Sequence, residues 1–200
     1  GKPEDINTST VAAPQINELL VVKGKRGQPV RNLRLYGLSF EAALPGSSAV
    51  SYEYAHACEL VASSLSSCGG TGISIRKGCY QTRILDNSFQ TIDNMAISIH
   101  GPEGPADGKD ILRETIISYN RIVDCGGINI NASFSLFTTI SHNYITRTRG
   151  RYAISVGGWH NLEEAIDGAY LVEYNHLEDV QKDADDSGAI KTAGTTFSSA

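Results

Sequence analysis

Three aspartates stand close together near the end of the sequence, in the stretch "DADDSGAIKTAG" at residues 183–194. They are Asp183, Asp185 and Asp186, and a short segment that reads as a β-strand follows them. Mutual repulsion between such close carboxylates raises the pKa of at least one of them, which suits a proton donor. Three acidic side chains also suit a calcium ion, and a solvated acidic loop is the third interpretation.

Two further residues with useful chemistry are Trp159 and His160, in the stretch "VGGWHN". Trp159 is the single tryptophan of the chain. If exposed it would stack on a sugar ring, and if buried it would close the end of a strand. His160 has the side chain of an acid–base or hydrogen-bonding group, although a histidine after a strand is also an ordinary surface residue.

A repeated pattern in the sequence must position these residues. Each copy has a β-rich run, then Asn-x-Ile, Asn-x-Leu or Asn-x-Phe, then a turn of variable length and a strand of the form small-Ile-x-Ile. The asparagines of the four clear copies are Asn87, Asn120, Asn143 and Asn175, and Ser63 holds this place in an earlier copy. The second strands are expected at residues 72–75, 96–99, 127–130, 153–156 and 189–192.

The length of the repeat predicts the fold. Asn120 and Asn143 are 23 residues apart, and the longer steps contain insertions such as "GPEGPADGKD" at 101–110. A period of this length with two or three short strands is typical of one coil of a parallel β-helix, and the leucine ladder of a leucine-rich repeat is missing. We therefore predict an all-β, right-handed parallel β-helix of about six coils.

The domain assignment follows from the same repeat. A chain of 200 residues is expected to form one domain. We assign residues 1–27 to an initial segment, 28–194 to the coils, and 195–200 to an incomplete terminal coil. Asparagine tolerates the left-handed conformation of a tight corner, and its amide can bond to its neighbours, so stacked coils should carry a ladder of asparagines.

Alignment of the second strands predicts which side chains face outward, since alternate residues of a strand face opposite ways. Ile97, Ile128, Ile154 and Ile190 should form one interior column. The first outward column is expected to contain Ser74, Ser98, Asn129, Ser155 and Lys191, and the second Arg76, His100, Asn131, Gly157 and Ala193. Such a polar face suits a sugar polymer, although it is also what an ordinary solvated sheet presents.

The corner before these strands carries aligned acidic residues. Asp93, Asp124 and Asp186 fall three positions before the small residue of their strands. For Asp93 and Asp124 we favour a role in forming the turn. The turn that holds Asp186 is longer, which brings Asp183 and Asp185 beside it.

Composition limits the partners of the chain. The net charge of −5 argues against nucleic acid, which needs a basic surface. No apolar run is long enough for a membrane-spanning helix, so no membrane partner is expected. The cysteines Cys58, Cys68, Cys79 and Cys125 lack the spacing of zinc ligands and are expected to be small buried side chains. The expected location is secreted or periplasmic, although no signal peptide is visible.

Taken in order, these residues resemble the right-handed parallel β-helix glycoside hydrolases, the group with fucosidase, xylanase and β-xylosidase branches. The stretch at 16–40 is similar to that family's first strand, and "ISHNYITRTRGRYAISVGGWHN" at 140–161 is similar to its tryptophan coil. "DDSGAIKTAG" at 185–194 resembles its catalytic segment, and the catalytic aspartate falls on Asp186. Asp185 stands where that family has serine, and Lys191 where it has tyrosine.

The resemblance implies a hydrolase that acts on an oligosaccharide or polysaccharide, with Asp186 and Asp185 as catalytic residues. Substrate would be bound by Trp159, His160, His100, Asn131, Arg76 and Lys191. Glycoside hydrolysis needs two carboxylates, and in that family the second lies on a later coil. No cofactor is expected, and calcium at Asp183, Asp185 and Asp186 is the alternative.

Two other functions remain open. A polysaccharide lyase or epimerase would use a basic residue such as Lys191 or Arg76 to abstract the proton next to a uronic carboxylate. A non-catalytic carbohydrate-binding or adhesin β-helix is the third hypothesis. Because a β-helix leaves an open end, we expect the C-terminal end to continue into further coils or to be covered by another chain.

Overall fold

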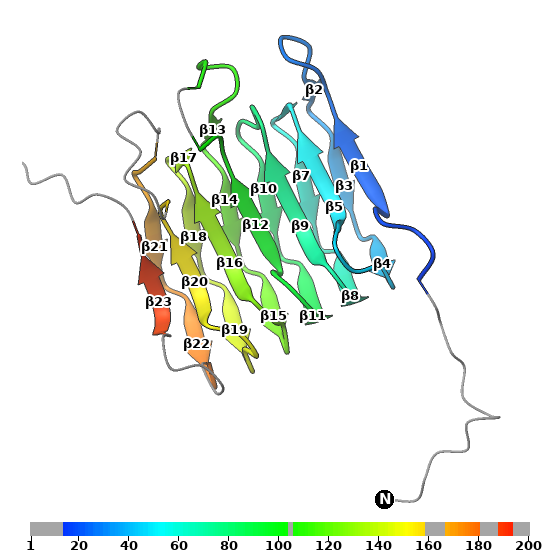
Figure 1. Ribbon diagram of the computed structural model, residues 1–200, viewed down its shortest axis with the longest axis vertical. Helices are drawn as coiled ribbons and strands as arrows, with labels where there is room; N and C mark the ends of the chain where they lie inside the picture. Colours follow the sequence, from blue (N-terminus) through cyan, green and yellow to red (C-terminus); the bar gives the residue numbers. More distant parts are fainter. Residues whose placement is uncertain (1–13, 104–105, 159–166, 181–187, 194–200) are drawn as a thin grey trace, which may run out of the picture.

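The computed structural model describes residues 14–103, 106–158, 167–180 and 188–193, and these residues form strands and loops without any helix (Figure 1). None of them therefore builds a helix that could cross a membrane. All pairings between named strands are parallel, in every sheet. The prediction of an all-β fold built from parallel strands is confirmed.

Three large sheets and two short strand pairs account for the named strands. The seven-stranded sheet contains, in spatial order, β1 (Leu20–Lys23), β5 (Ser48–Glu53), β9 (Thr71–Arg76), β12 (Ile97–His100), β16 (Ile128–Ser133), β20 (Tyr152–Val156) and β23 (Gly188–Thr192). The β3 sheet contains β3 (Arg34–Tyr36), β7 (Glu59–Val61), β10 (Arg83–Leu85), β14 (Ile116–Ser118), β18 (Thr139–Ser141) and β21 (Leu171–Glu173). The β4 sheet contains β4 (Ser39–Glu41), β8 (Ser64–Cys68), β11 (Ser88–Ile92), β15 (Arg121–Val123), β19 (Tyr144–Thr146) and β22 (His176–Glu178). The short pairs are β2 (Val30–Arg31) with β6 (Ala55–His56), and β13 (Leu112–Arg113) with β17 (Ser135–Leu136).

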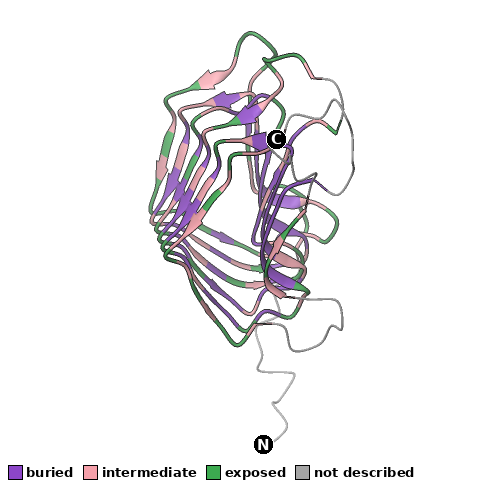
Figure 2. Cartoon of the chain, turned by 90° about the vertical axis from the view of Figure 1, so that its left-hand side faces the viewer, coloured by how far each residue is buried: buried purple, intermediate pink, exposed green. Residues whose placement is uncertain are grey.

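The chain visits the three large sheets in a constant order. From β1 to β20, each strand of the seven-stranded sheet is followed by a strand of the β3 sheet, then by one of the β4 sheet, and then by the next strand of the seven-stranded sheet. Consecutive repeats therefore lie side by side, as the colour sequence of Figure 1 shows. Seen from the side view in Figure 2, the repeats follow nearly the same path.

The core follows from the period-two alternation of the strands. In β9 and β12, Ile73, Ile75, Ile97 and Ile99 are fully buried. Ile73 pairs with Ile97, and Ile75 with Ile99, so that equal side chains stack along the sheet direction. The buried side chains form one continuous hydrophobic cluster, and removal of this apolar surface from water is the main force that favours the fold.

The predicted interior column needs one correction. Ile97 pairs with Ile130, which pairs in turn with Ile154, and Ile154 pairs with Ile190. The prediction was wrong for Ile128, which lies opposite Tyr152 instead. A slip of two residues leaves the inward and outward sides of the strand unchanged, so the alternation could not reveal it.

The predicted ladder of asparagines is confirmed by its hydrogen bonds. The Nδ2 atoms of Asn87, Asn120 and Asn143 each donate to the Oδ1 atom of the next asparagine, at 3.0, 3.0 and 2.9 Å. The last acceptor is Asn175, and at the other end the backbone N–H of Ser63 donates to Asn87 Oδ1 at 2.9 Å.

The left-handed conformation, in contrast, was assigned to the wrong residue. It belongs to the residue before each asparagine, with φ between 50° and 60° for the whole column. The column consists of Ala62, Asp86, Tyr119, His142 and Tyr174. The corner therefore bends one residue earlier than expected, and this leaves each asparagine side chain directed into the ladder.

The cysteines are free and buried, which confirms the prediction for them. Burial raises the pKa of all four thiols, to about 12 for Cys79 and about 11 for Cys125. Such thiols are protonated at neutral pH and behave as small apolar side chains.

The three large sheets end at β21, β22 and β23, which are paired on one side only within the described residues. Apolar side chains are half exposed there, with Leu171 at 48% and Ile190 at 49%. The expectation that further coils or another chain cover this end stays a prediction.

Candidate functional site

A groove of about 550 Å³ lies on the outer face of the seven-stranded sheet, over β5, β9 and β12. Its lining is small and polar, and it contains hydroxyl, amide, guanidinium and imidazole groups but no carboxylate or large apolar side chain. The lining residues are Gly46, Ser47, Ser48, Gly69, Gly70, Thr71, Ser74, Arg76, Asn94, Ser98 and His100. Arg76 and His100, which were predicted as binding residues, are thus brought together in one groove.

Small residues are required where the turns meet at one end of this groove. A Cβ atom at Gly70 would lie 2.0 Å from the carbonyl oxygen of Ser47, so no larger residue fits there without a backbone shift. Beside it, Asn94 Nδ2 donates to Thr71 Oγ1 at 3.2 Å. This bond joins the turn before β12 to the start of β9 and orients the amide along the lining.

His100 is held on both sides of its ring. Its Nε2 atom lies 2.9 Å from Glu103 Oε1, and its Nδ1 atom lies 2.9 Å from Ser133 Oγ. Since the carboxylate can only accept, Nε2 carries a proton. Nδ1 then accepts a hydrogen bond from the Ser133 hydroxyl in the neutral ring and donates one in the imidazolium. The imidazole therefore has a defined orientation, with its ring nearly perpendicular to that of Phe134 at a centroid distance of 5.6 Å.

Arg76 lies in register between Glu53 on β5 and His100 on β12. The Glu53 carboxylate is already paired with Lys23 and Lys77, both at 3.1 Å. Among the described residues no carboxylate forms an ion pair with Arg76. Its exposed guanidinium is therefore available to a ligand in the groove.

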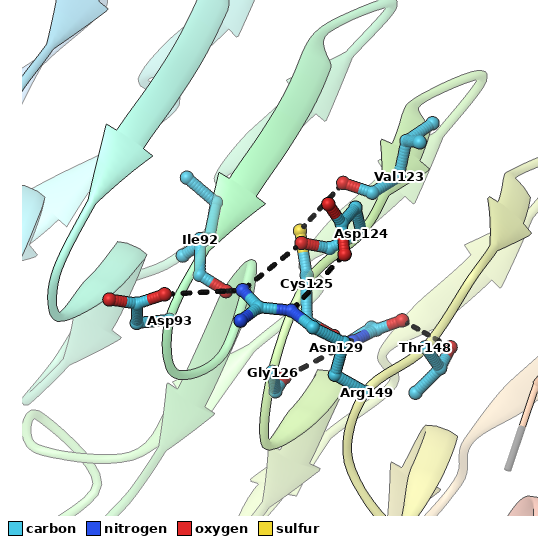
Figure 3. Close-up of polar contacts among 9 residues, drawn as sticks. All are labelled: Ile92, Asp93, Val123, Asp124, Cys125, Gly126, Asn129, Thr148 and Arg149. Atoms are coloured by element: carbon cyan, nitrogen blue, oxygen red, sulfur yellow. Dashed lines mark hydrogen bonds and ion pairs between the residues drawn. The ribbon is translucent and has the colours of Figure 1, made fainter. Parts of the chain in front are cut away.

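Asn131 occupies a different column from the predicted one. It pairs with Ser98 on one side and with Ser155 on the other, so it belongs to the first outward column. Ser133 takes the place beside His100 that was predicted for Asn131. Asn129, predicted in the first column, is fully buried and bonds to Thr148 Oγ1 at 2.7 Å and to the Cys125 and Gly126 carbonyls (Figure 3).

Lys191 lies on the same sheet as the groove but at its other end. It pairs with Ser155, and its Nζ atom donates to the Tyr152 hydroxyl at 3.0 Å and lies 4.8 Å from the centre of that ring. β23 is three strands away from β12, which corresponds to about 14 Å along the stack. Lys191 therefore lies on a different part of this face from Arg76 and His100, and its neighbour Ser155 is fully buried.

The remaining predicted site residues are Trp159, His160, Asp183, Asp185 and Asp186, and they lie outside the described residues. Both predicted catalytic residues belong to this group, as does the whole calcium set. Within the described part of the chain no group of three metal-binding side chains occurs. The segment at 181–187 directly precedes β23, so it leads into the sheet that carries the groove.

The two described corner aspartates do not form the predicted column. They meet instead at Arg149, whose Nη2 atom lies 3.1 Å from Asp93 Oδ1 and whose Nε atom lies 3.2 Å from Asp124 Oδ1 (Figure 3). The same guanidinium donates to the backbone carbonyls of Ile92 and Asp124. Asp93 and Asp124 thus join the turns of three repeats, which is a structural role.

Glu103, Asn94 and Ser133 were missed by the sequence analysis. Glu103 follows His100 by three residues in the insertion at 101–110, and this spacing was the available signal. Asn94 belongs to the same repeat as His100, 6 residues before it, and Ser133 belongs to the next repeat, 33 residues after it. No spacing within one repeat could point to Ser133.

Comparisons of this chain with models of protein families, with curated proteins and with solved structures gave no match.

Proposed function

We propose that this chain is a right-handed parallel β-helix of about six coils that binds an oligosaccharide or polysaccharide along the outer face of its seven-stranded sheet. Support for the fold comes from the constant order in which the strands enter three parallel sheets. A coil of a β-helix requires this order, and the connections of parallel strands are right-handed in nearly all proteins.

The observation that carries the binding proposal is the lining of the groove. Sugar hydroxyls both donate and accept hydrogen bonds, and serine, threonine, asparagine and histidine side chains can do the same. Arg76 adds up to five donors in a planar fork. The groove extends over three neighbouring strands, and Asn131, Ser155 and Lys191 continue its outward column, although Asn131 and Ser155 are buried there.

The proposed reaction is hydrolysis of a glycosidic bond, with Asp186 and Asp185 as catalytic residues. Support comes from the crowded carboxylates at 183–186 and from their place just before β23 of the same sheet. Hydrolysis needs one carboxyl group as acid and a second as nucleophile or base. In this proposal the carboxylates act on the sugar bound near Lys191, while Arg76 and His100 hold units further along the same chain.

Binding is tested with a panel of neutral oligosaccharides, including xylose- and fucose-containing ones, by titration calorimetry. Arg76→Gln and His100→Gln should each weaken binding about tenfold, because each removes a hydrogen bond that involves a charged or polarised donor. Arg83→Gln is the matched control, since it removes the same charge from β10 of the β3 sheet. Equal binding by all variants, or equal loss in the control, contradicts the groove assignment.

Hydrolysis is tested with aryl glycosides and polysaccharides, by the release of aryl alcohol or reducing sugar. Asp186→Asn should abolish turnover and leave unfolding by urea unchanged. Full turnover in this variant contradicts the catalytic assignment. Binding without turnover in the unaltered protein would identify a non-catalytic binding module instead.

One observation favours a lyase as the second candidate. The Nζ atom of Lys191 donates to the Tyr152 hydroxyl at 3.0 Å, so two groups that can exchange a proton stand together, and Lys191 becomes a base when it has lost its proton. Such a pair can remove the proton next to a uronic carboxylate and protonate the leaving oxygen. A lyase would form an unsaturated product that absorbs ultraviolet light, and a hydrolase would not.

A further inference from the structure

A second pocket, of about 490 Å³, is built from residues that share nothing with the groove described above. It lies where β2 and β6 meet the turns that follow β9 and precede β13. Its lining residues are Gly27, Pro29, Arg31, Tyr54, His56, Gly78, Tyr80, Asp107, Gly108, Lys109, Ile111 and Arg113. Basic and aromatic side chains dominate this lining, in contrast to the hydroxyl groups of the groove.

Four of these residues form one column across successive repeats. Arg31 pairs with His56 in the short pair of β2 and β6. Isolated parallel bridges then connect His56 to Tyr80, and Tyr80 to Arg113. Arg31 therefore neighbours His56 at one end of the column and Arg113 neighbours Tyr80 at the other end, about 14 Å apart along the stack. Both guanidinium groups are carried on long side chains that can extend toward the imidazole and the phenol between them.

The aromatic groups of the column are fixed in place. The Nε2 atom of His56 lies 3.1 Å from the carbonyl oxygen of Gly78, so this nitrogen carries a proton and Nδ1 is the one that titrates. The imidazole meets the Tyr80 ring edge to face at 5.8 Å. The guanidinium of Arg113 lies 4.8 Å from the centre of the same ring. Because the side chains are already ordered, little entropy is lost when a ligand binds.

The carboxylates near the pocket are engaged elsewhere. Asp107 and Asp110 both pair with Arg26, at 2.8 and 3.1 Å. Asp110 also accepts a hydrogen bond from the Tyr54 hydroxyl at 2.8 Å. Within the described residues neither Arg31 nor Arg113 has a carboxylate partner, and Lys109 adds a further positive charge to the lining.

The positive charge of the pocket affects the pKa of His56. Burial lowers the pKa of His56, and the positive charges of Arg31 and Arg113 lower it further, against the hydrogen bond to Gly78, which raises it. The imidazole thus stands in a positive field that no carboxylate of the pocket neutralises. An anion bound there would neutralise this field and so favour protonation of His56. The protonated imidazole would then be a third positive group in contact with the anion, beside the two guanidinium groups.

We propose that this pocket binds an oxyanion, such as the sulfate or carboxylate group of an acidic sugar, between Arg31, His56 and Arg113. Guanidinium groups bind such anions through paired hydrogen bonds, and the fixed imidazole supplies a further donor. The proposal is independent of the saccharide groove. The anion pocket can exist whether the groove binds neutral sugars or binds no sugar at all.

Binding is measured by nuclear magnetic resonance of the histidine ring protons, with sodium sulfate and sodium glucuronate as separate probes. Sodium chloride keeps the ionic strength constant, and glucose is the neutral control. The chain has five histidines, and His56→Gln identifies the signal of His56. Either anion should saturate the site and raise the pKa of His56 by about one unit, and affinity should increase as the pH falls through that pKa.

The variants Arg31→Gln and Arg113→Gln should each weaken binding about tenfold, the effect of losing one charge-assisted hydrogen bond. Arg121→Gln is the matched control, since Arg121 packs on the Tyr144 ring at 5.7 Å, as Arg113 does on Tyr80, but lies outside the pocket. The probe that binds with the higher affinity shows whether the pocket prefers a sulfate or a carboxylate group. Absence of saturation with both anions, or an equal loss in Arg121→Gln, overturns the proposal.

Discussion

Replacement of Asn120 by alanine should destabilise the protein strongly, because this residue stands in the middle of the asparagine ladder. It is 1% exposed, and its Nδ2 atom donates to the Ile84 and Ser118 carbonyls and to Asn143 Oδ1. Its Oδ1 atom accepts from both the backbone N–H and the Nδ2 atom of Asn87, at 3.0 Å. The amide therefore connects three successive repeats.

The magnitude follows from what the substitution leaves behind. Asn87 Nδ2 retains the Leu60 carbonyl as acceptor, and Asn143 Oδ1 retains the backbone N–H of Asn120. The Asn87 backbone N–H, in contrast, loses the acceptor that Asn120 provided. One orphaned buried donor costs about 1–3 kcal/mol, and each other lost hydrogen bond costs about 1 kcal/mol. The two hydrogens of Asn120 Nδ2 make its three contacts worth about two bonds, and the bond from Asn87 Nδ2 is the third. The free energy of unfolding should therefore fall by about 4–6 kcal/mol, a large part of the total for a single domain.

Two variants make the test specific. Asn120→Ser should lose about half as much, because a serine hydroxyl can accept the Asn87 N–H, as Ser63 Oγ accepts the Leu38 N–H at 3.1 Å. Asn175→Ala removes the last amide of the ladder, which is only partly buried, so water can replace its bonds and the loss should be about 1–2 kcal/mol. Urea unfolding followed by circular dichroism measures all three. If Asn120→Ala costs no more than Asn175→Ala, the ladder does not stabilise the stack in the way described.

Three further outcomes are expected. Burial raises the pKa of the four cysteine thiols, so a thiol reagent should leave them unmodified in the folded protein and should react with all four after unfolding; rapid reaction before unfolding would contradict their burial. Arg149→Gln should lower the free energy of unfolding by about 1–2 kcal/mol, and added salt should reduce this difference because the ion pairs are partly exposed; a salt-independent difference would mean that packing, not charge, is involved. The folded pKa of His56 lies below its usual value of 6.5, so the unfolded chain takes up the proton first, and stability should fall as the pH drops through the window below that value. His56→Gln should flatten this part of the stability profile, and an unchanged slope would contradict the sign of the shift.

Much of the fold could be predicted because the sequence repeats its own pattern. The alternation of isoleucine with small polar residues is a local property with period two, so it predicts which side of a strand is buried without knowledge of the rest. The recurrence of asparagine at the same place in each repeat predicts a ladder for the same reason, and the ladder is present from Asn87 to Asn175. The burial of the cysteines was also predicted, because free cysteines without the spacing of metal ligands usually behave as small apolar side chains.

The tertiary structure decided the features that depend on how one repeat meets the next. The register of β16 was one of these, because turns of different length move a strand by two residues without exposing its apolar side. Arg149, and the column of Arg31, His56, Tyr80 and Arg113, were others, since their partners come from repeats that are distant in sequence. Charged residues do not recur at a fixed interval in the sequence, so their positions do not indicate their partners. Their long, flexible side chains can also reach several neighbours. Only the packing of the repeats determines which neighbour each of them meets.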